Sequence, residues 1–495
     1  MFKDLKNLNA ALAKKDENFW LKAGEKMALR LFREASKRVP AYRDFLKSNK
    51  INPAKIKTII DFSKIPSVDK KNYLLKYPLE KLCWDGKIEK ADMISLSSGS
   101  SGDPFFWLRD KEQEEETALS HEAFLVDSFG IDKNSTLLIV SFAMGMWVAG
   151  TLTYRAVQKI AENYRLTVIT PGINKQDVLN VVRKIGNKYK QIVIAGYPPF
   201  VKDIIDEGER QNIDWKKHKI KFLFAAEAFS EKWRDYMYKK IGAKNPLKDS
   251  LNIYGTADAL ILGHETPLSI LIRRLADKHG KELYRDLFKH DERVPTLVQY
   301  NPALRYLESV NGNLIFSAFS GIPLVRYAIG DTGDATQYSK VISLLKKHDI
   351  NMDKEVRLAK ISNWKLPFLY VYGRNDFTAS LYGINIHPEN IRDALSDKEA
   401  EGDVSGKFVM FTGNDGRMNQ YLKIVVELKD GVSNAGVKLE ERIKSAVVKM
   451  LKEKNMEYNE LYKSLGVMVE PQIKLYRYGH EDFFKPGIKQ KWRKI

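Results

Sequence analysis

The sequence predicts an α/β protein with a large N-terminal domain of parallel sheets covered by helices and a small C-terminal α+β domain. Between about residues 91 and 330, short apolar segments such as TLLIV, LTVIT, QIVIAG and KFLFAAE each precede an amphipathic stretch. That alternation is typical of parallel strands joined by helices. From about residue 372 the pattern changes, because the alternating segments FVMFTG and LKIVVELK surround one long helical stretch over 437–453. This change favours a separate α+β unit.

The other elements follow in order along the chain. Residues 1–90 are expected to be helical, with prolines at 40, 53, 66 and 78 at the helix boundaries. Residues 134–154 carry no charge and are about long enough to cross a membrane. Their serine, threonine and glycine content instead favours a buried strand over 137–142, a turn and a helix, so no membrane span is expected. Residues 266–291 are predicted to form one further helix.

The composition is that of a globular protein, with 44% hydrophobic and 29% charged residues. The single cysteine, Cys83, excludes an intramolecular disulfide and fits a reducing, cytoplasmic location. The formal net charge of +19 would suit a nucleic acid, an anionic membrane or an acidic substrate such as a nucleotide. Because the excess is spread along the chain rather than gathered in an arm, a lysine-rich surface is favoured and no nucleic-acid partner is expected.

A loop rich in serine and glycine is the first candidate site. It lies between the strand-like segments MISL and FFWL and consists of Ser97, Ser98, Gly99, Ser100, Ser101, Gly102, Asp103 and Pro104. Such a loop can direct backbone N–H groups and hydroxyls at phosphate oxygens. It differs from the Walker P-loop, which ends in Gly-Lys-Ser/Thr. Alone, this composition is more often an ordinary surface turn.

Two further motifs present a carboxylate just after a glycine turn. In Tyr254-Gly255-Thr256-Ala257-Asp258 the carboxylate could hold Mg²⁺ beside a triphosphate. In Arg326-Tyr327-Ala328-Ile329-Gly330-Asp331 it could accept hydrogen bonds from both hydroxyls of a ribose. Each motif alone is a common strand-to-loop transition.

Four further segments complete the series of motifs along the chain. They are Ala226-Glu227-Ala-Phe-Ser-Glu231, Tyr372-Gly373-Arg374-Asn375-Asp376, Gly383-Ile-Asn-Ile-His-Pro388 and the terminal Gly487-Ile-Lys489-Gln-Lys491. Taken together and in order, the motifs resemble the adenylate-forming (acyl- and aryl-CoA ligase, AMP-binding) superfamily. Within it they are similar to the phenylacetate–CoA ligase-like branch. The resemblance runs from about residue 38 to 494. It implies a domain of residues 1–372 that binds AMP and the acyl group, and a mobile domain of residues 373–495.

The resemblance implies an AMP-forming acid–thiol ligase. A small carboxylic acid would react with ATP, aided by Mg²⁺, to give acyl-AMP, and a thiol, most simply that of coenzyme A, would then displace AMP. The implied phosphate-loop residues are Ser97, Ser98, Gly99, Ser100, Ser101 and Gly102. Glu227 would lie near the adenine or acyl pocket, Tyr254 and Gly255 beside the adenine, and Thr256 at the α-phosphate. Asp331, helped by Arg374, would bind the ribose, and Asp258 would bind the metal. Lys489 would act in adenylation, and rotation about the hinge Asp376 would then withdraw it.

The acyl pocket is expected to be apolar and suited to an aryl or short-chain acid. The residues that match the family's pocket walls are Phe142, Met144, Gly145, Trp147, Tyr197 and Pro198. A cluster of methionine and aromatic residues is more often ordinary core, but the glycine break at Gly145 favours a pocket wall.

The chain departs from the family pattern at four places. Asp103 replaces a lysine of the phosphate loop, Asp258 is shorter than the usual glutamate, Phe377 replaces the second hinge aspartate, and Ile488 leaves Lys491 as an alternative to Lys489. These changes keep three alternatives open: an acceptor such as a carrier protein or amine, transfer of AMP as in coenzyme F390 synthetases, and a degenerate nucleotide binder without turnover. A homodimer is compatible with all of them.

Overall fold

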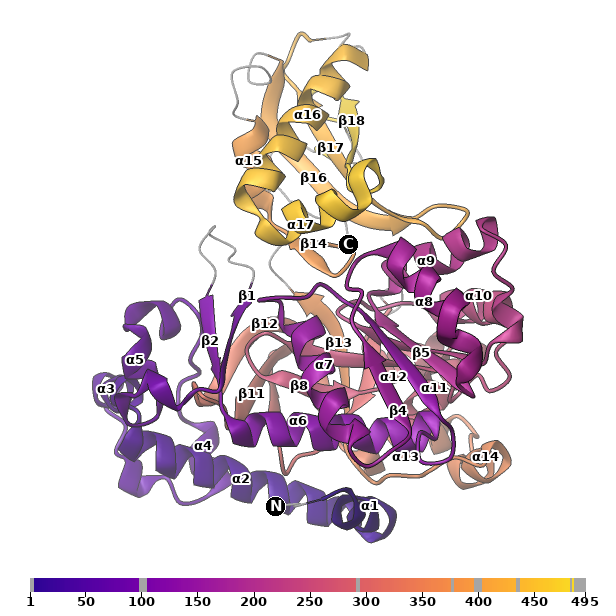
Figure 1. Cartoon of the computed structure of the whole chain (residues 1–495). Coiled ribbons are helices and arrows are strands. Elements are labelled where there is room, and N and C mark those ends of the chain that lie inside the picture. The colour runs from indigo at the N-terminus through magenta and orange to yellow at the C-terminus, as the bar shows by residue number, and fades with distance from the viewer. Residues whose placement is uncertain are drawn as a thin grey trace.

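The computed structural model describes residues 4–97, 105–290, 294–374, 378–395, 403–432, 437–480 and 483–484. A large domain carries the N-terminus, and a small domain that begins with β14 lies on one end of it (Figure 1). The described residues contain an 11-stranded sheet of order β10-β11-β12-β13-β9-β8-β7-β6-β5-β3-β4 in the large domain and a 3-stranded sheet in the small one. The fold class predicted from the sequence is therefore confirmed.

The first ninety residues are helical, as predicted. They form α1 (Leu5–Lys14), α2 (Glu17–Arg38), α3 (Pro40–Ser48), α4 (Ile59–Ser63) and α5 (Leu79–Leu82), with short 3-10 turns at Pro53–Lys55, Leu74–Lys76, Trp84–Gly86 and Ile88–Lys90. A separate antiparallel hairpin follows, made of β1 (Met93–Ser97) and β2 (Phe105–Arg109). The serine- and glycine-rich segment 98–104 connects these two strands and lies outside the described residues.

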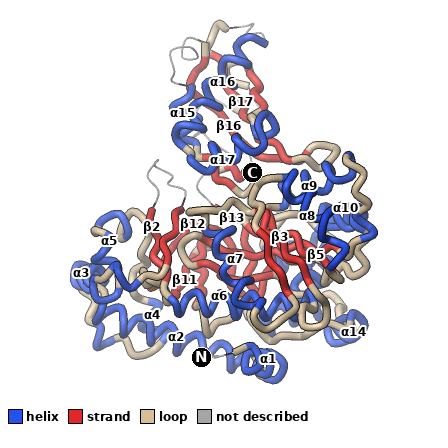
Figure 2. The backbone as a smooth tube through the Cα atoms, viewed as in Figure 1, coloured by secondary structure: helices blue, strands red, loops and turns tan. Residues whose placement is uncertain are grey.

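The first half of the large sheet is parallel and is covered by helices, as the strand–helix alternation indicated (Figure 2). Its strands are β3 (Thr136–Ser141), β4 (Leu166–Ile169), β5 (Gln191–Gly196), β6 (Ile220–Ala225) and β7 (Ser250–Thr256). Its helices are α6 (Lys111–Phe124), continued by a π-helical turn at Leu125–Phe129, α7 (Val148–Ala161), α8 (Lys175–Ile185), α9 (Pro198–Arg210) and α10 (Glu231–Ile241). None of the helices in the described part of the chain is long and apolar enough to cross a membrane.

The second half of the sheet is antiparallel, which the sequence did not reveal. It consists of β8 (Leu260–His264), β9 (Thr296–Gln299), β10 (Tyr306–Val310), β11 (Asn313–Ala318), β12 (Leu324–Thr336) and β13 (Phe368–Arg374). Its helices are α11 (Pro267–His279), α12 (Lys281–Phe288), α13 (Tyr338–Lys347) and α14 (Met352–Ala359). The single helix predicted over 266–291 is thus wrong, because Gly280 adopts a φ of +95° and separates α11 from α12.

The small domain is α+β, and it contains the predicted long helix. Its elements are β14 (Ala379–Leu381), β15 (Ile384–Ile386), α15 (Pro388–Leu395), β16 (Val404–Asn414), β17 (Gln420–Leu428), α16 (Val437–Lys454), α17 (Met456–Leu465) and β18 (Gln472–Tyr476). One buried apolar cluster joins the two domains, since it includes Val201 and Trp233 of the large domain and Leu381 and Tyr382 of the small one. β13 runs to Arg374, across the boundary predicted after residue 372, and the division itself stays a prediction.

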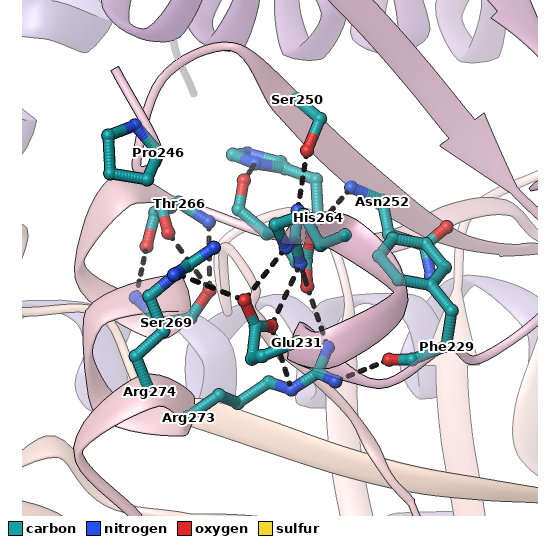
Figure 3. A network of polar contacts seen from close by, with 12 residues as sticks. Phe229, Glu231, Pro246, Ser250, Asn252, His264, Thr266, Ser269, Arg273 and Arg274 are labelled. Atoms are coloured by element: carbon teal, nitrogen blue, oxygen red, sulfur yellow. Dashed lines mark hydrogen bonds and ion pairs between the residues drawn. The ribbon is translucent and has the colours of Figure 1, made fainter. Parts of the chain in front are cut away.

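A buried network of charges joins α10 to α11 beside the loop that connects β6 to α10 (Figure 3). The Glu265 carboxylate accepts from Arg234 Nη2 at 2.7 Å and from Arg273 Nη1 at 3.0 Å. Glu231 pairs with Arg234 at 2.9 Å and with Arg274 at 3.1 Å. Burial opposes ionisation of Glu231, but these guanidinium groups hold its pKa below the usual value.

The network also fixes the backbone of that loop, residues 226–230. Arg273 Nη2 donates to the Phe229 carbonyl at 2.5 Å, and Asn252 Nδ2 donates to the Glu227 carbonyl at 2.8 Å. The Asn252 N–H in turn donates to Glu265 Oε2 at 2.8 Å. Buried, mutually paired polar groups are rigid because each would be costly to leave unpaired. The position of Glu227 is therefore determined by side chains of α11 and β7.

We predict that Arg273→Met lowers the free energy of unfolding by about 3 kcal/mol, because it leaves a buried carboxylate and the Phe229 carbonyl without a donor. Urea denaturation followed by circular dichroism measures this. The control is Arg210→Met, since Arg210 is 68% exposed in its pair with Glu207 and should contribute less than about 0.5 kcal/mol. An Arg273→Met protein as stable as the control would show that the network is dispensable.

Candidate functional site

Four parallel strands of the large sheet end at one edge, and each carries a candidate residue there. Phe142 follows β3, Tyr197 follows β5, Glu227 lies two residues beyond β6, and Thr256 ends β7. In open parallel sheets, ligands bind outside the carboxyl ends of the strands. The sequence alone could not bring these residues together, but the strand order does.

The candidate pocket residues form an apolar cluster at this edge. The rings of Phe142 and Tyr197 meet edge to face with centroids 5.0 Å apart, and Met144 packs against the same cluster. Pro198 is buried at the first position of α9. Gly145 has a φ of +79°, a backbone conformation that favours glycine and turns the chain after β3.

Trp147 lies with the neighbouring hairpin rather than in this cluster. It forms an isolated bridge with Leu96 in β1, where the Leu96 N–H donates to the Met146 carbonyl at 3.1 Å. The turn after β3 therefore runs beside the strand that leads into the serine- and glycine-rich segment. Of the predicted wall residues, Phe142, Met144 and Tyr197 lie together, and Trp147 lies beside β1.

The two glycine-turn motifs interlock through two hydrogen bonds. Tyr254 donates its hydroxyl to Asp331 Oδ2 at 2.6 Å, and Tyr327 donates its hydroxyl to Asp258 Oδ1 at 2.8 Å. Each tyrosine belongs to one motif and each carboxylate to the other. Both aspartates are nearly buried, at 7% and 6% exposure. The reciprocal pairing holds the two carboxylates at a set distance from the sheet edge.

Arg109, which the sequence reasoning missed, fixes the turn that carries Asp258. Its guanidinium donates to the Ala257 carbonyl and, at 3.4 Å, to the Asp258 carbonyl. Burial lowers the pKa of Arg109 to about 9, which the nearby Asp258 carboxylate opposes. Thr256 contributes to the same turn, because its hydroxyl accepts from the Ala259 N–H at 3.1 Å.

Asp258 has the chemistry of a Mg²⁺ ligand. Among the described residues there is no cluster of three or more His, Cys, Asp or Glu side chains that could hold a metal. A single carboxylate suffices where substrate phosphates complete the coordination of Mg²⁺. Tyr327 engages only one of the two Asp258 oxygens, so the second one fits such an ion.

Lys70 is a second residue that the sequence reasoning missed. Its Nζ lies 3.5 Å from Ser97 Oγ, at the residue where β1 leads into segment 98–104. The chain at Val68, just before Lys70, is held beside β12 by two backbone hydrogen bonds. The Val68 N–H donates to the Arg326 carbonyl at 3.0 Å, and the Ala328 N–H donates to the Val68 carbonyl at 2.8 Å. Lys70 lies in the 1–90 stretch that was predicted to be helical, and the helical pattern does not mark it as a site residue.

Several predicted residues lie outside the described residues, and their roles stay predictions. They are Ser98, Gly99, Ser100, Ser101, Gly102, Asp103, Asp376, Phe377, Lys489 and Lys491. For Arg374 the structure describes the backbone, which pairs with Asp331 between β12 and β13. That register places the motif that ends in Asp331 beside the Gly373-Arg374 segment of β13.

Glu227 makes its side-chain contacts with the small domain. Its carboxylate accepts from the Gly383 N–H at 2.5 Å, from Ser380 Oγ at 3.0 Å and from Gln420 Nε2 at 2.8 Å. Although the residue retains some exposed surface, burial raises the pKa of its carboxyl group to about 7, against the effect of these three donors. Glu227 thus lies at the boundary of the two domains.

The partner of Glu227 is a tight hairpin turn. Tyr382 and Gly383, with φ of +50° and +79°, connect β14 to β15, as in two-residue turns that need positive φ at both positions. A Cβ on Gly383 would lie 2.6 Å from a ring atom of Tyr197. The hairpin tip therefore lies directly on the candidate acyl pocket.

The sequence matches no protein-family model and no curated protein, but solved structures match. A 2-hydroxyisobutyryl-CoA ligase with 2-HIB-AMP and CoA, in its thioesterification state, gives a TM-score of 0.66 at 15% identity over 98% of this chain and 91% of that one. Its postadenylation state with 2-HIB-AMP gives 0.54 at 14% identity over 98% and 90%. An open conformation gives 0.56 at 15% identity over 98% and 94%.

These matches span both domains of this chain. The chain therefore has the fold of the adenylate-forming acyl-CoA ligases.

Proposed function

We propose that this protein is an AMP-forming ligase that activates a small carboxylic acid with ATP and passes the acyl group to a thiol, most simply coenzyme A. The observation that carries the proposal is the reciprocal pairing of Tyr254 with Asp331 and of Tyr327 with Asp258. The two bonds join residues that are 77 and 69 positions apart, and the one carboxylate suits a ribose while the other suits a cation. A phenylacetate–CoA ligase-like activity is the finer form of this proposal.

In the first half-reaction, a carboxylate oxygen of the acid attacks the α-phosphorus of ATP, and the bond to the pyrophosphate oxygen breaks. Asp331, with Arg374, would accept the ribose hydroxyls, and the segment from Ser97 to Gly102 would donate to the β- and γ-phosphates. Bound Mg²⁺ at Asp258 would neutralise the charge that develops on the phosphates. Lys489, with Lys491 as the alternative, would bridge the carboxylate and the α-phosphate.

In the second half-reaction, the thiol sulfur attacks the acyl carbon, and AMP leaves with the electron pair of the acyl–oxygen bond. Rotation about Asp376 would withdraw the lysine and bring the hairpin tip at Gly383 to the acceptor's path. The position of that tip on Tyr197 supports this assignment. So does the higher TM-score with the thioesterification state of the reference ligase, 0.66 against 0.54 in the postadenylation state.

The acid is proposed to be an aryl or short-chain acid. Phe142, Met144 and Tyr197 belong to one apolar cluster, and their rings and thioether would form an apolar wall for the acyl group. Apolar walls of this kind select by shape, and they distinguish poorly between acids that differ by one methylene group.

The function is tested by pyrophosphate release from ATP and Mg²⁺ with a panel of aryl and short-chain acids, with and without coenzyme A. We expect release that depends on one class of acid and increases with coenzyme A. Release that depends on the acid but is indifferent to coenzyme A would move the acceptor to a carrier protein or an amine. No release with any acid would contradict the ligase and favour AMP transfer or nucleotide binding without turnover.

Lys70→Ala is predicted to lower kcat/KM for ATP in adenylation by about tenfold or more, because a charged hydrogen bond to a phosphate is lost. The matched control is Lys71→Ala, since Lys71 is the exposed neighbour of Lys70 and should retain full activity. Equal activity of the two variants would remove Lys70 from the nucleotide site.

Gly383→Ala is predicted to slow acyl transfer from preformed acyl-AMP by about tenfold or more, while pyrophosphate release without coenzyme A is retained. The added Cβ would overlap the Tyr197 ring and would strain a φ of +79°. Gly416→Ala is the control, because a Cβ there would meet no atom within 4 Å. Equal losses in both half-reactions would contradict a role confined to transfer.

A further inference from the structure

The large domain presents the Glu227 carboxylate to three donors of the small domain. The Gly383 N–H, the Ser380 hydroxyl and the Gln420 amide converge on it at 2.5, 3.0 and 2.8 Å. All three are neutral groups, so in the described residues the carboxylate is satisfied by hydrogen bonds rather than by a cation. They come from β14, from the hairpin turn and from the start of β17, so they connect to more than one loop of the small domain.

A second carboxylate, that of Asp203, binds the same hairpin tip. The Tyr382 hydroxyl donates to Asp203 Oδ2 of α9 at 3.0 Å, and the Tyr382 ring is only 1% exposed. The adjacent Lys202 Nζ donates to Asn419 Oδ1 at 2.7 Å. Asp203 is itself nearly buried. The tip therefore inserts between two acidic side chains that belong to different elements of the large domain.

Contacts within the large domain fix the backbone of Glu227 independently of its contacts with the small domain. Its own carbonyl accepts from Asn252, and the Phe229 carbonyl accepts from Arg273 of the buried network. A preorganised acceptor binds its donors with less loss of conformational entropy than a flexible one. The carboxylate therefore acts as a fixed receptor for the small domain.

We propose that Glu227, supported by Asp203, is a latch that holds the small domain in this docked arrangement and so determines what share of the enzyme is poised for acyl transfer. Its consequence for catalysis rests on the proposed function, but the docking itself does not. Without the carboxylate, the three half-buried donors would lose their acceptor in the docked arrangement and would be solvated by water when undocked. That difference favours undocking.

The docked share can be measured by double electron–electron resonance between spin labels on Lys111→Cys in α6 and Lys449→Cys in α16, both exposed positions, in a Cys83→Ala background. The variants are Glu227→Ala, Gln420→Ala and the pair. The control is Glu209→Ala, which lies on α9 and pairs with Lys240 of the large domain. Thermal unfolding is recorded for each variant.

We expect one dominant distance in the parent and the control, and a fall of about tenfold or more in the ratio of docked to undocked protein in Glu227→Ala. Gln420→Ala should have a smaller effect, and the pair should resemble Glu227→Ala, because both changes remove the same contact. Gln420→Ala approaches the latch from the small domain, so the test stands even where Glu227→Ala folds poorly.

A distance distribution in Glu227→Ala and Gln420→Ala that equals that of the control would overturn the latch. In the enzymatic assay, the latch predicts that Glu227→Ala slows transfer from preformed acyl-AMP more than adenylation, and equal slowing would contradict it. The distance measurement needs no turnover. The two measurements together therefore distinguish a latch that fails while catalysis is normal from a latch that holds while catalysis is absent.

Discussion

The hydrogen bonds between the Glu227 carboxylate and the tip of the β14–β15 hairpin connect the two halves of this protein. On one side, the residue is fixed by Asn252 and by the charge network of Glu265 and Arg273. On the other side, its carboxylate accepts a hydrogen bond from the Gly383 N–H, and Gly383 lies against the Tyr197 ring of the apolar cluster. The buried network, the candidate acyl site and the position of the small domain thus depend on one loop of a few residues.

The chemistry at the sheet edge follows from the same arrangement of strands. The parallel half of the sheet places Phe142, Tyr197, Glu227 and Thr256 at the ends of neighbouring strands. The antiparallel half brings β12 and its Asp331 back to Tyr254. The paired motif carboxylates and the apolar cluster consequently belong to the strands of one sheet and to the turns that follow them.

Much of the fold could be predicted because local patterns report it. The strands over 136–141 and 191–196 are mostly apolar and buried along their whole length, and the helix Val437–Lys454 follows an uninterrupted helical pattern. The antiparallel half of the sheet depends on tertiary contacts, and the break between α11 and α12 depends on the backbone angle of Gly280. Lys70 and Arg109 were missed for the same reason, since each acts on residues 27 to 149 positions away, and no local pattern marks such a pairing.

The central claim is that the Glu227 carboxylate is enclosed between the two domains, and its pKa measures this directly. A pH titration of the protein labelled with carboxyl-13C glutamate, with Glu227→Gln to assign the resonance, gives that pKa by NMR. The account predicts a midpoint near 7, with the proton bound below it, because burial disfavours the ionised form. A midpoint near the ordinary glutamate value of about 4.3 would contradict an enclosure that disfavours the ionised form.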